Sequence, residues 1–440
     1  MLAPAPATLK TEWRPLAALG DVAADWRDLC RRAAEPNVFY EPAFALAAAP
    51  ALGRDAGAVL AWSQDRRLLG LFPLRVERRR YGVPLRLLAG WTHPYGPLGT
   101  PLVDRDHIAG VIAAFLDHAA GDAGLPKLLL LAFLADDGPV AAALDAEIAR
   151  RGLRQASFDR HQRALLRTTS DAEGYLAAAL GKKRRHDLQR KRRRLADGVL
   201  LTCEIENAPE RVAAILADFL ALEAGGWKGR AGTAAAQAPD IVRFMSVAVA
   251  GLAAEGKVLA ACLRRDGRAI AANIVIRSGA GAWGWKIAYD ESLARCSPGV
   301  QLLIDVTARL IGARDIDWTD SCATPGNSMM DHVWRERRTF TDRLIAVTPD
   351  AAFGPACRLE RLRRGAIALA KRLRDLIANL TARATYPPPW RCRRPRRSPA
   401  GWWRRRRCRR GAGRSPRRRR ARPAWSGGNR PAPPRCCAAH

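Results

Sequence analysis

The chain lacks an uninterrupted apolar run of the roughly 18 residues that span a bilayer, and Met1 to Gly20 lacks the apolar core of a signal peptide. Its ten cysteines show no CxxC spacing. Four of them lie in the stretch 387–440, and the others are scattered as Cys30, Cys203, Cys262, Cys296, Cys322 and Cys357. These absences argue against a disulfide framework and a cysteine zinc site, so we expect a cytoplasmic protein without a metal.

Acidic and aliphatic side chains are missing from residues 387–440, which contain 19 arginines but no Asp, Glu, Leu, Ile, Val, Phe or Met. A segment without aliphatic residues cannot build a core, so we expect residues 385–440 to form a disordered tail. Two interpretations stay open: an arginine-rich arm that binds nucleic acid or an anionic membrane, or GC-rich DNA translated out of frame. Without the 19 arginines, the net charge of +32 falls to +13.

The rest of the sequence has an ordinary globular composition, and 440 residues exceed the usual length of one domain. We expect an N-terminal lobe over 1–168, a C-terminal lobe over 169–350 and a basic amphipathic helix over 355–384. The patterns in the first lobe predict the following elements: a helix over Trp13–Ala34, a hairpin of Ala58–Trp62 and Leu68–Val76, a helix over Ile108–Ala119, a strand over Lys127–Phe133 and a helix over Val140–Arg151.

The second lobe repeats this plan with a stronger β signal. Its patterns predict these elements: a basic helix over Asp171–Ala196, a strand over Leu200–Ile205, a helix over Pro209–Ala224, a meander of Val258–Arg264, Ala269–Arg277 and Gly281–Tyr289, a helix over Val300–Ile311 and short strands at Asp315–Trp318 and Arg343–Val347. The expected fold class is therefore α/β, with two tandem lobes that each have a mixed, mostly antiparallel sheet flanked by helices.

Ser297-Pro298-Gly299 opens the helix that follows the meander. A helix N-terminus offers unpaired backbone N–H groups and a partial positive charge, which suit the pyrophosphate of a coenzyme. Glycine at the third position would let a ligand approach the backbone. The predicted donor contacts are Ser297, Gly299, Val300 and Gln301, although the same tripeptide commonly serves as a simple helix cap.

Three stretches carry a family resemblance: KKRRHDLQRKRRRL from Lys182, EAGGWKGR from Glu223, and WKIAYDE from Trp285 together with Ser297-Pro298-Gly299. They resemble the GNAT-type acetyltransferases associated with bacterial cellulose and exopolysaccharide biosynthesis. That family is similar to the Fem-type peptidoglycan aminoacyltransferases, which consist of two GNAT-like lobes in tandem. The resemblance implies transfer of an acyl group from a thioester, usually acetyl-CoA or another acyl-CoA, to an amine or hydroxyl.

Candidate catalytic residues cluster around the end of the third meander strand. Lys286 lies among apolar strand residues, so its charge must reach a cleft, a phosphate or a carboxylate. Strict alternation predicts that Lys286 faces away from Trp283, Trp285, Ile287 and Tyr289. Asp290 could act as a base or orient the acceptor, and Tyr289 could protonate the leaving thiolate, although a turn aspartate and a half-buried tyrosine are the ordinary interpretations.

The acceptor side is predicted from the resemblance and from loop position. Trp227 and Lys228 follow a helix and form a candidate acceptor pair under the family match. Asp320 and His332 flank the irregular loop 321–330, and loops often hold functional groups. In the Fem-like pattern an aromatic residue and a lysine precede a tryptophan in this region, whereas here Asp331-His332 precedes Val333-Trp334. This departure puts the usual acceptor chemistry in doubt.

Three functions remain open at this point. The first is an acyl-CoA-dependent N- or O-acyltransferase acting on a sugar-containing or amino acceptor of a cell-surface polymer. The second is an aminoacyl-tRNA-dependent peptidyltransferase, in which the basic run Lys182–Arg194 would contact tRNA; nucleic acid is a partner only in this hypothesis. The third is a non-catalytic basic binding module. The basic helices could also hold the protein at the inner membrane surface.

Overall fold

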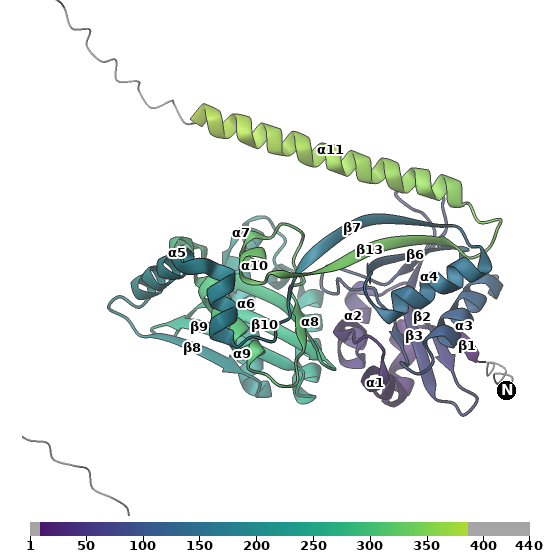
Figure 1. Ribbon diagram of the computed structural model, residues 1–440, viewed down its shortest axis with the longest axis horizontal. Coiled ribbons are helices and arrows are strands. Elements are labelled where there is room, and N and C mark those ends of the chain that lie inside the picture. The colour runs from purple at the N-terminus through teal and green to yellow at the C-terminus, as the bar shows by residue number, and fades with distance from the viewer. Residues whose placement is uncertain (1–8, 386–440) are drawn as a thin grey trace, which may run out of the picture. The chain divides into compact units, whose positions relative to one another are not determined.

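The structure is a computed structural model that describes residues 9–385 (Figure 1). Strands of the first half of the chain are β1 (Lys10–Pro15), β2 (Ala56–Trp62), β3 (Leu68–Glu77), β4 (Leu87–Gly90), β5 (Leu102–Val103), β6 (Leu128–Ala135) and β7 (Gln155–Leu166). Strands of the second half are β8 (Leu201–Glu206), β9 (Val258–Arg265), β10 (Arg268–Ser278), β11 (Gly281–Tyr289), β12 (Trp318–Asp320) and β13 (Glu336–Ala346).

Helices accompany both sets of strands. The first half has α1 (Ala23–Arg32), α2 (Pro42–Leu52), α3 (Ile108–Gly121) and α4 (Pro139–Arg151). The second half has α5 (Ala172–Leu195), α6 (Pro209–Gly225), α7 (Trp227–Arg230), α8 (Pro239–Ala254), α9 (Pro298–Ile311), α10 (Ser328–Val333) and α11 (Phe353–Thr385). None of the helices described between residues 9 and 385 is long and apolar enough to cross a membrane.

All strands join one mixed sheet in the order β1-β2-β3-β4-β6-β13-β7-β12-β11-β10-β9-β8, with β5 beside β3. Two neighbouring pairs are parallel, β4 with β6 and β11 with β12, and the other pairs are antiparallel. This confirms the predicted mixed, mostly antiparallel α/β class. Each half thus contains one parallel pair within an otherwise antiparallel set.

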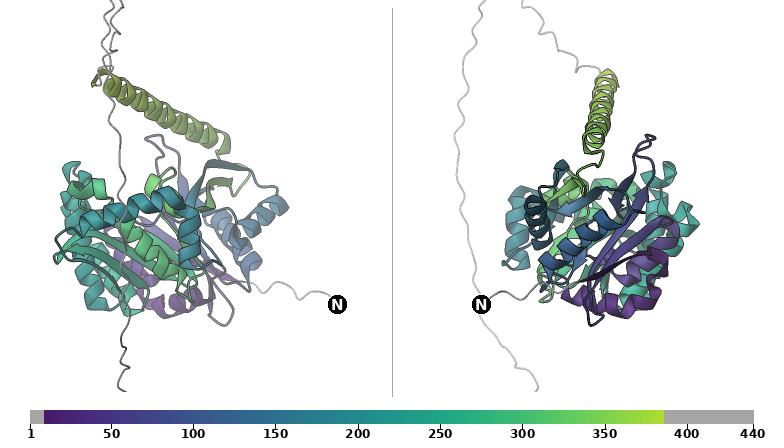
Figure 2. Two further views of the ribbon diagram at one scale, coloured as in Figure 1. Left: turned by 60° about the vertical axis from the view of Figure 1, so that its left-hand side comes forward. Right: turned by 90° about the vertical axis from the view of Figure 1, so that its right-hand side faces the viewer.

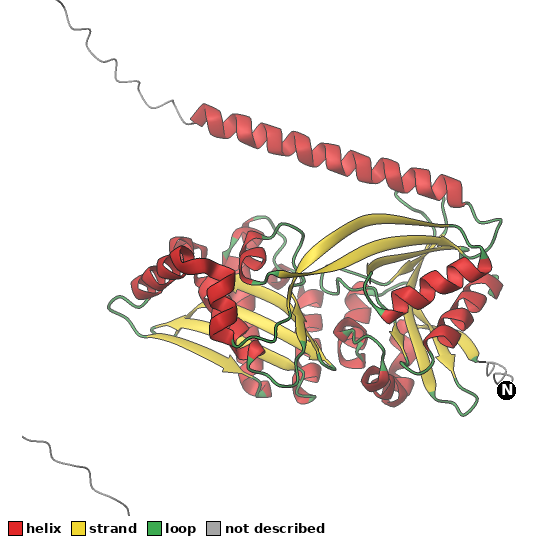
Figure 3. Cartoon of the chain, in the orientation of Figure 1, coloured by secondary structure: helices red, strands yellow, loops and turns green. Residues whose placement is uncertain are grey.

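The two expected sheets form one continuous sheet because two long strands join the halves. β13 comes last in the sequence, yet it pairs with β6 of the first half, and β7 pairs with both β13 and β12. Figures 1 and 3 show β7 and β13 running side by side between the two groups of strands. The chain up to Arg372 accordingly clusters as one compact unit.

Apolar side chains project from both faces of the sheet, and helices pack on each face (Figure 2). On β10, Ala272 and Ile274 enter a core with residues of α6 and α8, whereas Ala271 and Val275 enter a core with residues of α5 and α9. The period of two in a strand produces this division. A ligand site on β10 or β11 therefore belongs to one face or the other.

Several sequence predictions need correction. The predicted helix Trp13–Ala34 is instead β1, a 3-10 helix (Leu16–Val22) and α1, and Trp13 pairs with Val59. Helices α2, α7, α8 and α10 and strands β5 and β7 were not predicted from the sequence. Helix α2 is apolar on all sides and has almost no amphipathic period, so its pattern gave no helix signal. The predicted disordered tail lies outside the described residues, except that 385 still belongs to α11.

Candidate functional site

A β-bulge in β11 determines where Lys286 points. Ile274 of β10 pairs with Lys286, but the next residue, Val275, pairs with Gly284, so Trp285 has no partner in the register. The extra residue places the Trp285 and Lys286 side chains on the same face of the sheet. Accordingly, Lys286 Nζ lies 5.6 Å from the Trp285 ring centroid. The predicted strict alternation is therefore wrong: Trp285 packs in the core with α6 and α8, while Tyr289 packs with α9.

Lys286 is largely enclosed by aromatic and charged neighbours. Its Nζ lies 4.2 Å from the ring centroid of Tyr95, and Trp285 Nε1 donates to the Tyr95 carbonyl at 2.7 Å. Burial, together with the nearby Lys228 charge, lowers the pKa of Lys286 to about 8, against the opposing effect of Glu223. An amine with this pKa can give up and accept a proton near neutral pH, which an ordinary exposed lysine cannot do efficiently.

Lys228 and Glu223 form a charged pair next to Lys286. Lys228 Nζ lies 2.5 Å from Glu223 Oε1, and the other oxygen of this mostly buried carboxylate accepts from Ala235 N at 2.9 Å. The pair fixes the short segment from α6 to α7. The two charges act in opposite directions on Lys286: the Lys228 ammonium lowers the pKa of Lys286, and the Glu223 carboxylate raises it.

A hollow of about 890 Å³ lies next to Lys286. His93 and Cys322 line this hollow, and both interact electrostatically with Lys286. Its walls come from the loop Thr92–Pro97, strand β7, the loop after β12 and the part of α11 before Arg372. Burial and the nearby Lys286 lower the pKa of His93 to about 3, so this imidazole is neutral. The charged residues of the lining are Arg160, Arg163, Arg364 and Lys371 against Asp159 and Asp342, and this excess of positive charge suits an acceptor that carries negative charge.

The N-terminus of α9 lies on the other face of β11, where Tyr289 packs. Ser297, the N-cap residue, has a left-handed backbone with φ 54°, and its hydroxyl is 3.4 Å from Lys191 Nζ of α5. Pro298 has no N–H group, so Gly299 and Val300 supply the first backbone donors of the helix. A lysine beside free backbone N–H groups forms a suitable anion site.

Two of the predicted donor contacts have structural roles. A Cβ on Gly299 would lie 3.0 Å from Cδ1 of Tyr289 and 3.5 Å from the Met329 sulfur, so glycine lets the Tyr289 ring pack closely against α9. Gln301 is buried, and its Nε2 donates to the Leu188 carbonyl at 2.8 Å, which ties α9 to α5. Direct contact of the Gln301 side chain with a donor therefore lacks support.

The two faces meet where β11 and β12 stop pairing. Their parallel register ends at Trp283 and Asp320, one residue before the bulged segment. Beyond this point, Gly284 faces Trp334, whose Cη2 would lie 3.3 Å from a Cβ at that position. Trp334 therefore packs against β11 where its pairing with β12 ends.

The remaining predicted residues have different surroundings. Trp227 is 60% exposed and lies at the start of α7, as a substrate-contacting aromatic would. Asp290 binds Arg268 at 2.7 Å and caps the turn at Ser292, which matches its ordinary interpretation. His332 is exposed on α10, where its ring bonds the Ser328 carbonyl of the same helix. The candidate site thus does not assemble these residues into one constellation.

Asp320 is 1% exposed, so its carboxylate is not positioned to touch a substrate. It faces the buried Arg163 at 3.5 Å and accepts from Cys322 N at 2.8 Å, where the backbone turns with φ 52°. Arg163 also donates to the Pro97 carbonyl at 2.6 Å and stacks on Phe340 at 4.1 Å. This ion pair holds together the two loops that line the hollow.

Sequence reasoning missed Tyr95, His93, Arg163 and the individual role of Lys191. The first three come from the other half of the chain, and no local pattern links them to Lys286. Lys191 was contained in the basic run, but only its position beside Ser297 distinguishes it from its neighbours. Glu223 and Lys228 are five residues apart in the sequence and lie in two different helices, so helical spacing does not predict their ion pair.

Known proteins share parts of this arrangement. Residues 182–325 match the family described as "Acetyltransferase (GNAT) domain", which includes Lys191, the bulged strand and the start of α9. No curated protein matches the chain significantly.

Solved structures resemble a larger part of the chain. FemX has 10% identity, with coverage of 74% of this chain and 96% of FemX and a TM-score of 0.51. L-PGS from Bacillus licheniformis has 13% identity, covers 80% and 97% of the two chains, and has a TM-score of 0.45. A tandem GNAT protein from the clavulanic acid biosynthesis pathway has 14% identity, coverage of 78% and 100%, and a TM-score of 0.36. The likeness to FemX concerns the fold alone.

Proposed function

We propose that the chain, whose residues 182–325 match a GNAT acetyltransferase domain, is an acyltransferase that transfers an acyl group from acyl-CoA to an amine or hydroxyl bound beside Lys286. One observation carries the proposal. The anion site at α9 and the amine of Lys286 lie on opposite faces of β11, at the point where β11 and β12 stop pairing.

In the proposed reaction, the donor binds on the α9 face of β11 and the acceptor binds on the Lys286 face. Lys191 and the backbone N–H groups of Gly299 and Val300 bind the coenzyme phosphates, which directs the thioester toward the bulge. Neutral Lys286 takes a proton from the acceptor amine or hydroxyl as that group attacks the thioester carbonyl. A backbone N–H of the bulged segment stabilises the oxyanion. The carbon–sulfur bond then breaks, and Tyr289, on the donor face, protonates the leaving thiolate.

The acceptor is proposed to occupy the hollow next to Lys286 and to extend toward Lys228, which lies near Lys286, and the exposed Trp227. Arg160 and Lys371 in the lining favour an acceptor with anionic groups, such as a charged sugar or a carboxylate-bearing amine. Together with the resemblance of the three sequence stretches, this supports a sugar-containing or amino acceptor in cell-surface polymer synthesis. Asp290, His332 and Asp320 are left outside the reaction.

An aminoacyl-tRNA donor is the alternative, and two observations favour it. The fold resembles FemX, and Lys182, Lys183 and Arg190 of α5 are exposed near the proposed donor site. Separate calorimetric titrations with acetyl-CoA and with a charged tRNA distinguish the two donors. The same exposed cations would hold the protein against an anionic membrane, which flotation with phosphatidylglycerol vesicles tests.

We predict that coenzyme A and acetyl-CoA raise the melting temperature of the full-length chain. A ligand that binds only the folded state at about 100 times its Kd adds about 2.7 kcal/mol of stability. Lys191→Met should reduce this shift and lower the melting temperature of the free protein only slightly, because its partly exposed ion pair with Asp187 is worth about 1 kcal/mol or less. Differential scanning fluorimetry measures both effects.

Gly299→Val provides the stronger test, since its branched side chain would collide with Tyr289 and cover the first N–H groups of α9. We expect no shift with either donor. Gly110→Val is the matched control, because Gly110 lies in α3 with open space around it. Absence of any shift in the wild-type protein at millimolar acetyl-CoA would remove the acyl-CoA proposal.

A further inference from the structure

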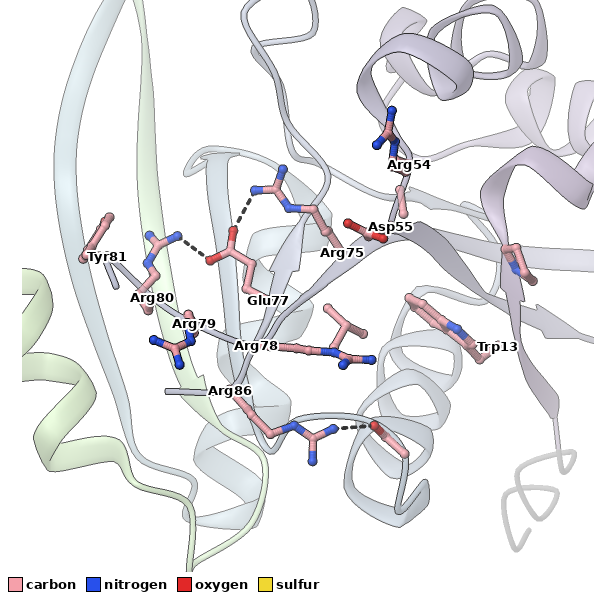
Figure 4. Close-up of a pocket in the computed structure, with 14 residues that line it drawn as sticks. Trp13, Arg54, Asp55, Arg75, Glu77, Arg78, Arg79, Arg80, Tyr81 and Arg86 are labelled. Carbon is pink, nitrogen blue, oxygen red and sulfur yellow. Dashed lines mark hydrogen bonds and ion pairs between the residues drawn. The ribbon is translucent and has the colours of Figure 1, made fainter. Parts of the chain in front are cut away.

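A second hollow, of about 1240 Å³, lies at the end of β1, β2 and β3, away from the proposed acyltransferase site (Figure 4). Six arginines contribute to its lining: Arg54, Arg75, Arg78, Arg79, Arg80 and Arg86. The acidic residues that line it are Asp55 and Glu77. The lining therefore has a large excess of positive charge within a concave surface.

Only part of this charge is neutralised by the protein. Arg75 and Arg80 bind Glu77 at 2.6 and 2.9 Å, and Arg80 also binds Glu360 at 2.8 Å. In contrast, Arg79 and Arg86 donate to the carbonyls of Gly82 and Gly124, as Figure 4 shows for Arg86.

Arg54 and Arg78 have no carboxylate partner among residues 9–385, and both side chains are exposed. Guanidinium groups that line one hollow without counter-charges give it a positive potential, so such a hollow attracts an anion. The planar fork of arginine matches two oxygens of a phosphate group, and charge-assisted bonds of this kind are the strong ones. Several forks around one hollow suit a ligand with more than one phosphate.

Trp13 gives the hollow an aromatic wall. The ring packs flat on the β2 backbone, because a Cβ at Gly57 would lie 2.3 Å from Cζ2 of Trp13. Trp13 is held at a fixed position by this contact and stays partly exposed. In Figure 4 the Arg78 side chain extends toward Trp13. An aromatic face next to arginines can stack a planar base while the arginines bind its phosphates.

We propose that this hollow binds a diphosphate ester, contacted by Arg54 and Arg78 and stacked against Trp13 when the ester is a nucleotide. The site is distinct from the α9 donor site, since β4, β6, β13, β7 and β12 separate β3 from β11 in the sheet. It therefore adds a second ligand to the proposed acyltransferase. The ester can come from a soluble nucleoside diphosphate or from a lipid headgroup, and the two sources share the same recognition chemistry.

The test is calorimetric titration of the full-length protein with inorganic pyrophosphate, uridine diphosphate and adenosine diphosphate. In parallel, phosphatidylcholine vesicles that contain a polyprenyl diphosphate probe the lipid source. The Arg54→Gln/Arg78→Gln variant should lose at least tenfold in affinity for the ligand that binds. Its melting temperature should be unchanged, because neither side chain bonds to another described residue. Trp13→Leu should weaken nucleotides more than pyrophosphate.

Arg66→Gln is the matched control, since Arg66 is exposed in the turn at the other end of β2 and β3 and should leave affinity unaltered. Lys191→Met should also retain pyrophosphate binding, which separates this site from the donor site. Binding of the soluble diphosphates supports a nucleotide, and binding of vesicles alone supports a lipid headgroup. The proposal is overturned if no probe binds, or if the double variant binds every probe as tightly as the wild type.

Discussion

Replacing Lys286 with methionine is expected to lower kcat/KM by roughly 10- to 150-fold, which corresponds to about 1.5–3 kcal/mol. Methionine keeps most of the side-chain volume next to Tyr95 but cannot accept a proton. The wild-type rate should rise with pH toward a plateau above about 8, because only the neutral amine acts as a base and the pKa of Lys286 is lowered to about 8. The Lys286→Met rate should lose this rise.

Lys286→Arg separates proton transfer from charge. Arginine stays protonated at all accessible pH values, so it should not restore the activity if Lys286 is a base, whereas partial rescue would indicate that the charge holds an anion. Lys10→Met is the control, since Lys10 is exposed at the start of β1. The measurement is kcat and KM against pH for the acceptor identified. Unaltered kinetics in Lys286→Met would place the reaction elsewhere.

Replacing Arg163 with methionine is expected to lower the free energy of unfolding by about 3–5 kcal/mol. Arg163 and Asp320 are 3% and 1% exposed, so the substitution leaves the Asp320 carboxylate buried without its counter-charge. The Pro97 carbonyl also loses its donor. Urea denaturation of the purified variant gives the change directly.

The double variant Arg163→Met/Asp320→Asn tests the cause of that loss. It should recover much of the stability, because no buried charge remains. Arg160→Met is the matched control on the same strand: its ion pair with Asp136 is at the surface, and we expect a change below about 1 kcal/mol. A small effect in Arg163→Met would mean that the ion pair does not hold the two loops together.

Much of the local structure followed from sequence pattern. The three strands of the meander, the basic helix and the helix after Ser297 lie within a few residues of the predicted ranges. These elements have strong periods and clear turns, such as Asp266-Gly267 between β9 and β10. Helix α8 was missed although Phe244, Met245, Ala248 and Val249 give it a helical stripe, so its signal was available in the sequence.

The candidate site depended on features that no local pattern contains. Lys286 stood out in the sequence as a charge among apolar strand residues, but alternation predicted the wrong neighbours. The bulge at Trp285 reversed the faces, and a bulge is fixed by the pairing of β11 with β10 rather than by the sequence of β11 alone. Similarly, Asp320 was a plausible loop carboxylate until its pairing with Arg163 of another strand was known.

The sequence by itself therefore determined the α/β class, the order of most elements, the unusual lysine and the resemblance to acyltransferases. Only the tertiary structure decided that the two halves share one sheet, that Tyr95 and His93 surround Lys286, and that six arginines gather in a separate hollow. The physical reason is the range of the interactions involved. Periodicity and turns reflect contacts between near neighbours in the chain, whereas burial, pKa shifts and charge clusters depend on segments that only folding brings together.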